Sequence, residues 1–207
     1  SLTTGTENVS IGYEASQKLT THGSIVHIGR SAGRYASGSN NTFVGRSAGS
    51  GGTTGAPYST GTMNVAVGTY AFDAFTSAEG ITAIGYHAGS AITTGVKNVT
   101  VGVYSGDALT TGARNVAIGS NTLGAATTAD FNVAIGQGAM ESAAASVAFS
   151  GVIAIGKGTL NALNSTDADG TIAIGYAALE VMTSGQYNTA VGYRAGDNVT
   201  TGDQNTL

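Results

Sequence analysis

The sequence contains no cysteine, no tryptophan and a single proline, and only 10% of its 207 residues are charged. Without cysteine, the chain can form neither a disulfide framework nor a thiolate metal site. Its eight basic residues are spread thinly in a chain of net charge −4, so there is no basic patch of the kind that binds nucleic acid. No apolar run approaches the ~18 residues of a membrane-spanning helix. We therefore expect no nucleic-acid partner and no membrane insertion in this segment.

Glycine is abundant instead, with 33 residues, and many of these glycines close a short repeated pattern. The pattern is Asn, a branched residue, a small residue, Ile or Val, and Gly, as in residues 115–119. The closing glycines are Gly12, Gly29, Gly45, Gly68, Gly85, Gly102, Gly119, Gly136, Gly156, Gly175 and Gly192. Most successive gaps are 17 residues, and a period of this size indicates a solenoid. We expect residues 1–207 to form one elongated repeat domain, a fragment of a longer fibre.

The branched positions of each copy predict a short strand, and ~17 residues per coil suit two short strands and two turns, or a flattened coil. β-Branched residues stand three positions and one position before the glycine, as at Val116 and Ile118. This alternation is typical of a strand with one buried face, whereas the recurring glycines disfavour helices. We expect the branched residues to form the core of the coil and Gly119 to form its corner. The predicted fold class is all-β, a parallel β-solenoid of about twelve coils of ~17 residues.

The residue between the two branched positions is alanine in seven copies and never Lys, Arg, Asp or Glu, which suggests a second packed surface. A thin coil is marginal alone, since each buried branched residue contributes ~1.5 to 3 kcal/mol and each ordered residue costs ~1 kcal/mol of backbone entropy. We expect this row to face the axis of a homotrimer; the alternative is a single-chain solenoid with the alanines inside a wider coil. The alanines of the row are Ala66, Ala83, Ala117, Ala134, Ala154, Ala173 and Ala190.

Stacking of equivalent residues predicts further features. Asn98, Asn115 and Asn132 are 17 residues apart, so coils stacked at ~4.8 Å would place their side-chain amides in a hydrogen-bonded asparagine ladder. Three gaps exceed 17 residues, and insertions in a solenoid form loops at a coil corner. We expect such loops near residues 50–63, 141–151 and 161–170.

The row immediately after the glycine is long and polar, so we place it at the solvent. Tyr13, Tyr86, Tyr176 and Tyr193 in this row are candidates for a glycan-contact surface, because tyrosine combines an apolar ring with a hydroxyl. Tyrosine is also simply a good strand residue, and a plain β-surface is the alternative. No nucleophile, base and acid set is recognisable. We expect no enzyme activity, no cofactor and no metal site.

Several copies resemble a known family of repeats. Residues 115–119, 132–136 and 188–192, the small-Gly endings at 88–89 and 195–196, and the recurring Thr-Thr-Gly spacer are similar to the head repeats of trimeric autotransporter adhesins and the related repeats of bacteriophage tail fibres. The resemblance implies a left-handed parallel β-roll, three chains side by side, and a role in attachment. The adhesin repeat differs in having a shorter period and a Ser after the Asn.

The functional expectation follows from the repeat and the resemblance together. We expect a stiff trimeric fibre segment of a phage tail fibre or bacterial surface adhesin, located outside the cell on a virion or on the bacterial surface. Its partners would be two further copies of the chain and a host-surface glycan or protein receptor. The alternative is an extracellular filament or matrix subunit that assembles end to end through the open edges of the solenoid.

Overall fold

The computed structural model describes residues 5–20, 23–143, 148–163 and 168–207, and within these ranges it consists of short strands and turns with no helix. No helix long and apolar enough to cross a membrane is therefore found in these ranges. The strands have three residues each: β1 (Val9–Ile11), β2 (Val26–Ile28), β3 (Thr42–Val44), β4 (Val65–Val67), β5 (Thr82–Ile84), β6 (Val99–Val101), β7 (Val116–Ile118), β8 (Val133–Ile135), β9 (Ile153–Ile155), β10 (Ile172–Ile174) and β11 (Thr189–Val191).

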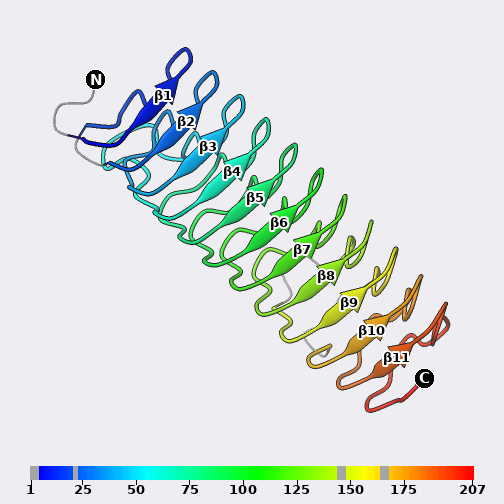
Figure 1. Ribbon diagram of the computed structural model, residues 1–207. Helices are drawn as coiled ribbons and strands as arrows, with labels where there is room; N and C mark the ends of the chain where they lie inside the picture. The colour runs from blue at the N-terminus through cyan, green and yellow to red at the C-terminus, as the bar shows by residue number, and fades with distance from the viewer. Residues whose placement is uncertain (1–4, 21–22, 144–147, 164–167) are drawn as a thin grey trace.

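The strands form one parallel sheet in chain order, β1 to β11, with one strand from each coil. Pairing is in register, so that Val116 lies opposite Val133 and Ala117 opposite Ala134. The sheet occupies one side of a straight rod, with β1 near one end and β11 near the other (Figure 1). Eleven strands at ~4.8 Å spacing give a sheet about 48 Å long. The predicted all-β parallel solenoid is confirmed.

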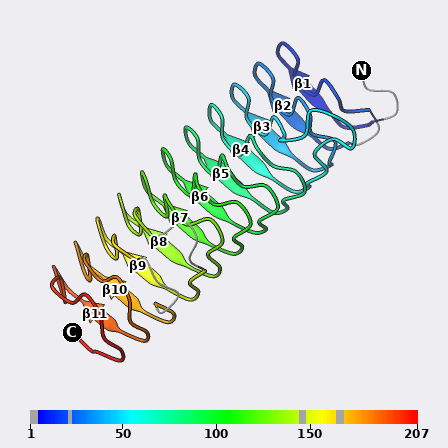
Figure 2. The same cartoon turned by 180° about the vertical axis from the view of Figure 1, so that it is seen from behind.

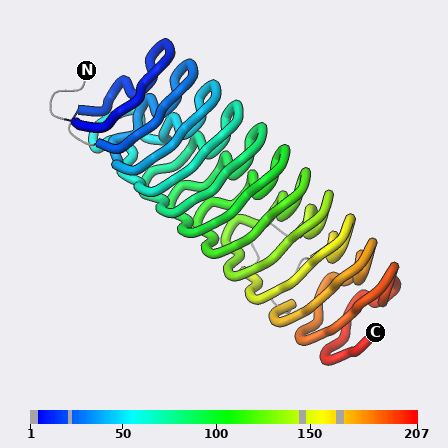
Figure 3. The backbone as a smooth tube through the Cα atoms, in the orientation of Figure 1, coloured from blue at the N-terminus to red at the C-terminus, as the bar shows by residue number. Residues whose placement is uncertain are grey.

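Each strand ends at a glycine corner, and the same corner recurs on every coil. Gly119 has a φ of 131°, and a Cβ added there would lie 2.8 Å from the carbonyl carbon of Gly136 on the next coil. A side chain is therefore excluded both by the backbone angle and by the stacked glycine above. The remaining sides of the coil are built from turns, which repeat with nearly the same outline along the rod (Figures 2 and 3).

The coil interior is the reverse of the expectation. The seven alanines of the small row are fully buried inside their own chain, whereas Ile84 and Ile118 are 40% and 37% exposed. The alanines therefore lie in the wider single-chain coil that was the alternative, and they cannot face a trimer axis. The expectation that Ala66, Ala83, Ala117, Ala134, Ala154, Ala173 and Ala190 form the trimer interface is wrong.

The asparagine row explains why alanine points inward. Asn115 stands two residues before Ala117 and so shares its face of the strand. The Asn115 amide is buried and donates to the carbonyl oxygen of Ala129 at 2.6 Å, inside the coil. Larger side chains from the turns, such as Leu109 and Leu123, fill the same interior, and most coils therefore carry a small residue at the strand.

An asparagine ladder runs through the interior. Asn115 Nδ2 donates to Asn98 Oδ1 at 3.1 Å, and Asn132 Nδ2 donates to Asn115 Oδ1 at 3.1 Å. Each Oδ1 also accepts the backbone N–H of the asparagine on the next coil, at 2.9 Å for Asn115 and 3.0 Å for Asn132. The same bond recurs at Asn205, which donates to Asn188. The ladder thus provides hydrogen-bond partners for buried backbone groups that the three-residue strands leave unpaired.

The longest gap of the repeat produces a surface loop. Residues 54–57 are exposed, and no atom lies within 4 Å of a Cβ built on Gly55. The chain rejoins the stack at Ser59, which bridges to Ala36. The other two expected loops, near residues 141–151 and 161–170, fall partly on 144–147 and 164–167, outside the described residues.

Candidate functional site

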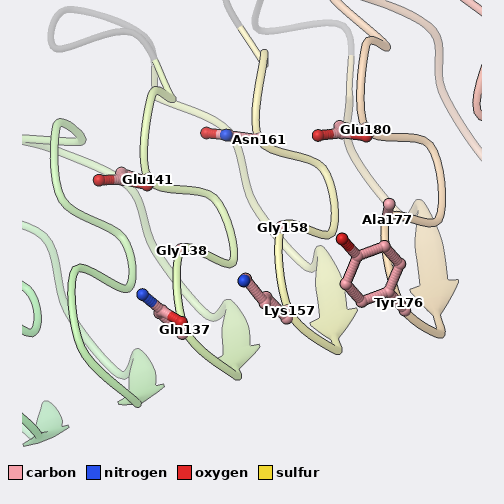
Figure 4. A pocket seen from close by; sticks show the side chains of 9 residues that line it. All are labelled: Gln137, Gly138, Glu141, Lys157, Gly158, Asn161, Tyr176, Ala177 and Glu180. Carbon is pink, nitrogen blue, oxygen red and sulfur yellow. The ribbon is translucent and has the colours of Figure 1, made fainter.

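A shallow hollow of about 160 Å³ lies at the corner that follows strands β8, β9 and β10. Its lining comes from three positions of the repeat, namely one, two and five residues after the closing glycine. Figure 4 shows Gln137, Lys157 and Tyr176 in one row, Glu141, Asn161 and Glu180 in a second row, and Gly138, Gly158 and Ala177 between them. The two polar rows are therefore the walls of the hollow, and the small residues are its floor.

The floor exists because the middle position carries little or no side chain in these coils. The backbone there is left-handed, with φ of 68° at Gly138, 67° at Gly158 and 53° at Ala177. Other coils place a full side chain at this position with the same backbone, for example Tyr70 at 57° and Tyr104 at 54°. The hollow is thus a stretch of the corner from which side chains are missing, and the fold itself accepts aromatic residues there.

A second hollow of about 240 Å³ continues the first toward the N-terminal end of the rod. It is lined by Tyr104, Asp107, Asn121, Gly124 and Glu141. Glu141 also lines the first hollow, so the two are neighbours along the rod axis. We call the two hollows together the corner groove.

An aromatic cluster closes the N-terminal end of the corner groove. The rings of Tyr70, His87 and Tyr104 stack on successive coils, with centroids 5.0 Å apart in the first pair and 5.5 Å apart in the second. Tyr86 meets the edge of His87 at 4.4 Å. The guanidinium of Arg46 lies over the Tyr70 ring at 5.3 Å, as in a cation–π contact. These rings form a continuous aromatic surface beside the groove.

The charge of the corner groove is mainly negative. Asp107, Glu141 and Glu180 contribute carboxylates, and Lys157 contributes the one ammonium group among its lining residues. The two ion pairs of the described residues, Arg34 with Glu14 and Arg194 with Asp197, both lie outside it.

Hydrogen bonding and burial modify two of these carboxyls. Asn121 Nδ2 donates to Glu141 Oε1 at 3.2 Å, which orients that carboxylate at the junction of the two hollows. Burial raises the pKa of the Asp107 carboxyl above its ordinary value, an effect opposed by a backbone hydrogen bond and by the nearby His87.

The structure separates the four predicted tyrosines. All are exposed, as expected for a solvent-facing row. Tyr176 lines the groove and stacks on Tyr193 at 5.3 Å, with an interplanar angle of 12°. Tyr86 belongs to the aromatic cluster at the other end, through contacts with His87 and Tyr104. Tyr13 lies on the first coil, far along the chain from both. Of the four, Tyr176 alone lines the groove, and Tyr86 and Tyr193 adjoin it through ring contacts.

Two rows that do most to shape the groove, two and five residues after the closing glycine, were not among the site residues predicted from the sequence. The row two after the glycine changes from Tyr70, His87 and Tyr104 to Gly138 and Gly158 within one domain. That change from aromatic to glycine was a visible signal. Its meaning depended on knowing that this row borders an open corner, which the spacing alone does not reveal.

The described residues contain no group of three or more His, Asp or Glu side chains that could hold a metal ion. The acidic residues of the corner groove lie on different coils, with Asn161 between Glu141 and Glu180 in their wall. Its chemistry is therefore that of a polar binding surface flanked by aromatic rings. Comparisons with protein-family models, with curated proteins and with solved structures found no match.

Proposed function

We propose that this chain is a structural and attachment protein, a stiff segment of a fibre in which three copies pack side by side. The fibre would belong to a phage tail or to a bacterial surface adhesin, outside the cell, and would present a surface to a host glycan or protein receptor. The straight solenoid supports the mechanical part of this role, because in-register coils make a rod without a hinge among the described strands.

The observation that carries the proposal is the outer sheet face. We define it as the residues three and one before each closing glycine, the first and last residues of β1 to β11. These 22 positions hold only Val, Ile and Thr, with no charged residue. A sheet face in contact with water normally carries polar or charged side chains, and contiguous exposed apolar strips mark interaction surfaces. A partner of equally apolar character is expected to cover it.

A second copy of the same chain meets that requirement. The strip is about 48 Å long and free of charge, so an identical strip in parallel would match it coil by coil. A third copy closes the arrangement around one axis, as in other closed cyclic oligomers. This moves the proposed trimer contact from the buried alanine row to the exposed branched residues on either side of it.

The proposal is tested by measuring the mass of the chain in solution. Sedimentation equilibrium at micromolar concentration is expected to give three times the mass of the 20.3 kDa chain. A single-chain mass that persists as the concentration is raised would overturn the side-by-side fibre.

An extracellular filament or matrix subunit is the second candidate, supported by the way in which one coil pairs with the next. Residues 205–207 pair with β11 through the same hydrogen bonds as an internal coil. Asn205 is bonded to Asn188 and Leu207 to Thr189. A strand from another copy could add in the same way. Long unbranched filaments in electron micrographs, with lengths that grow with concentration, would favour this candidate over a trimer of fixed length.

A further inference from the structure

The corner groove results from the small residues that stand two positions after the closing glycine in coils β8 to β10. A Cβ built on Gly158 meets no atom closer than 3.9 Å, where Glu180 Oε1 lies. The neighbouring Glu141 carboxylate is held by Asn121. The groove is therefore open and its polar walls are partly ordered, which lowers the entropy lost when a ligand binds.

The walls of the groove offer hydrogen bonds of both kinds at successive coils. The carboxylates of Asp107, Glu141 and Glu180 accept hydrogen bonds, and the amides of Gln137 and Asn161 both donate and accept. Aromatic rings stand at both ends, Tyr104 at one and the stacked Tyr176 at the other. Alternating apolar faces and hydroxyl groups are the properties of pyranose rings, which combine with stacking rings and polar side chains.

The charge of the corner groove and the spacing of the coils limit the class of ligand further. Three carboxylates against a single Lys157 would repel a polyanionic chain. Coils spaced at ~4.8 Å repeat the same wall positions along the axis, a spacing close to that of linked pyranose units in an extended chain. A short ligand would use one hollow, and a chain of several rings would span both.

We propose that the corner groove binds an uncharged linear oligosaccharide lying along the rod axis, with rings stacked on Tyr104 and Tyr176 and hydroxyls bonded to Glu141 and Glu180. This inference rests on the attachment role proposed above and names the ligand class and the site for it. It places binding on the side of the rod formed by the turns, whereas the outer sheet face serves contact between copies.

The test uses a groove-filling variant and a matched control. Gly158→Tyr puts into the floor a residue that the same position carries at Tyr104. Gly151→Tyr makes the same substitution on the same coil but before strand β9, where other coils carry Phe131 and Tyr187. Both glycines are left-handed, with φ of 67° and 70°, and neither Cβ would meet an atom closer than 3.9 Å. The two variants therefore carry the same backbone strain.

Binding is measured by isothermal titration calorimetry of the full chain with cellohexaose, hexa-N-acetylchitohexaose, maltohexaose and mannohexaose, and with hexagalacturonate as the anionic comparator. We expect at least one neutral hexasaccharide to bind, Gly158→Tyr to weaken it by about tenfold or more because a ring and its hydrogen bonds are lost, and Gly151→Tyr to leave it unchanged.

Three results would overturn the inference: no neutral chain binds, Gly158→Tyr binds as tightly as the parent chain, or hexagalacturonate binds most tightly. The mass of each sample, measured in parallel, separates this from the fibre proposal. If the mass is trimeric and no sugar binds, the groove inference fails and the fibre stands. If sugar binds and the mass is that of a single chain, the fibre proposal fails and the groove inference stands.

Discussion

Single residues inside the coil are matched in size across the interior. His27 occupies the row that holds alanine in seven other coils, and its ring stacks on Phe43 with centroids 4.8 Å apart. Space for the His27 ring exists because the opposing residue is Gly33, whose Cβ would lie 2.1 Å from His27 Nδ1. Gly49 stands in the same relation to Phe43, at 2.4 Å. A large residue at the strand is thus accompanied by a glycine six residues later.

The buried His27 makes stability depend on pH. Burial lowers the pKa of His27 from 6.5 to about 4, so the unfolded chain binds a proton that the folded chain rejects. The contribution of neutral His27 to the free energy of unfolding is fully present above pH 6.5. It is lost as the pH falls toward 4, by about 3 kcal/mol in total. Guanidinium unfolding followed by circular dichroism at pH 7.5 and 4.5 measures this loss.

The control for this prediction is His27→Phe. Phenylalanine keeps the stack on Phe43 and removes Nε2, which has no hydrogen-bond partner among the described residues. Ser16 Oγ loses its 2.7 Å bond to His27 Nδ1 but keeps Ser10 Oγ as a partner. Parent and variant share all other titrating groups, so the contributions of those groups cancel when the two losses of stability are subtracted. An equal loss of stability in both would show that His27 is not its source.

Residue patterns predicted much of the fold, but they predicted the wrong face of each strand to be buried. The two-residue alternation around Val116 and Ile118 shows which side chains share a face, and it correctly predicted strands. It does not show which face is inside. Asn115 held the missing information, because an asparagine ladder needs a buried environment and Ala117 shares its face. The groove was beyond such reasoning, since the spacing does not reveal that Gly138 and Gly158 border an open corner of the coil.

At the level of the coil, the asparagine ladder is the main polar support of the three-residue strands. Replacing Asn115 by Ala removes the donors to Ala129 and Asn98 and the acceptor for the Asn132 N–H. Leaving buried groups without partners in this way is expected to reduce the free energy of unfolding by about 2 to 4 kcal/mol. Chemical denaturation with an unchanged m-value measures the effect.

A surface asparagine provides the comparison for that variant. Asn198 is exposed, and its amide bonds only to the adjacent Asp197 in the described contacts. Asn198→Ala is expected to change stability by less than about 0.5 kcal/mol. If Asn115→Ala were equally neutral, the ladder would be a by-product of stacking with no stabilising role.

At the scale of the whole molecule, the rod has two sides with different properties. The sheet side carries uncharged branched residues along its whole length, and the turn side carries the tyrosines, the carboxylates and the corner groove. If three rods meet through their sheets, the axis of the fibre is dry and apolar while the ligand surfaces remain available. The position of Ala117, buried between two exposed neighbours, makes this arrangement testable with adjacent substitutions.

Substitutions within a single strand separate contact between copies from folding of the coil. Val116→Lys with Ile118→Lys places charge on the outer sheet face and is expected to reduce the trimer to single chains while the circular dichroism of the coil is retained. Val103→Lys with Val181→Lys adds the same charge at exposed positions off the sheet and should leave the mass unchanged. Ala117→Glu should instead unfold the coil, because its carboxylate would be buried without a partner. A trimer that survives the strand lysines but dissociates, still folded, in Ala117→Glu would return the interface to the alanine row.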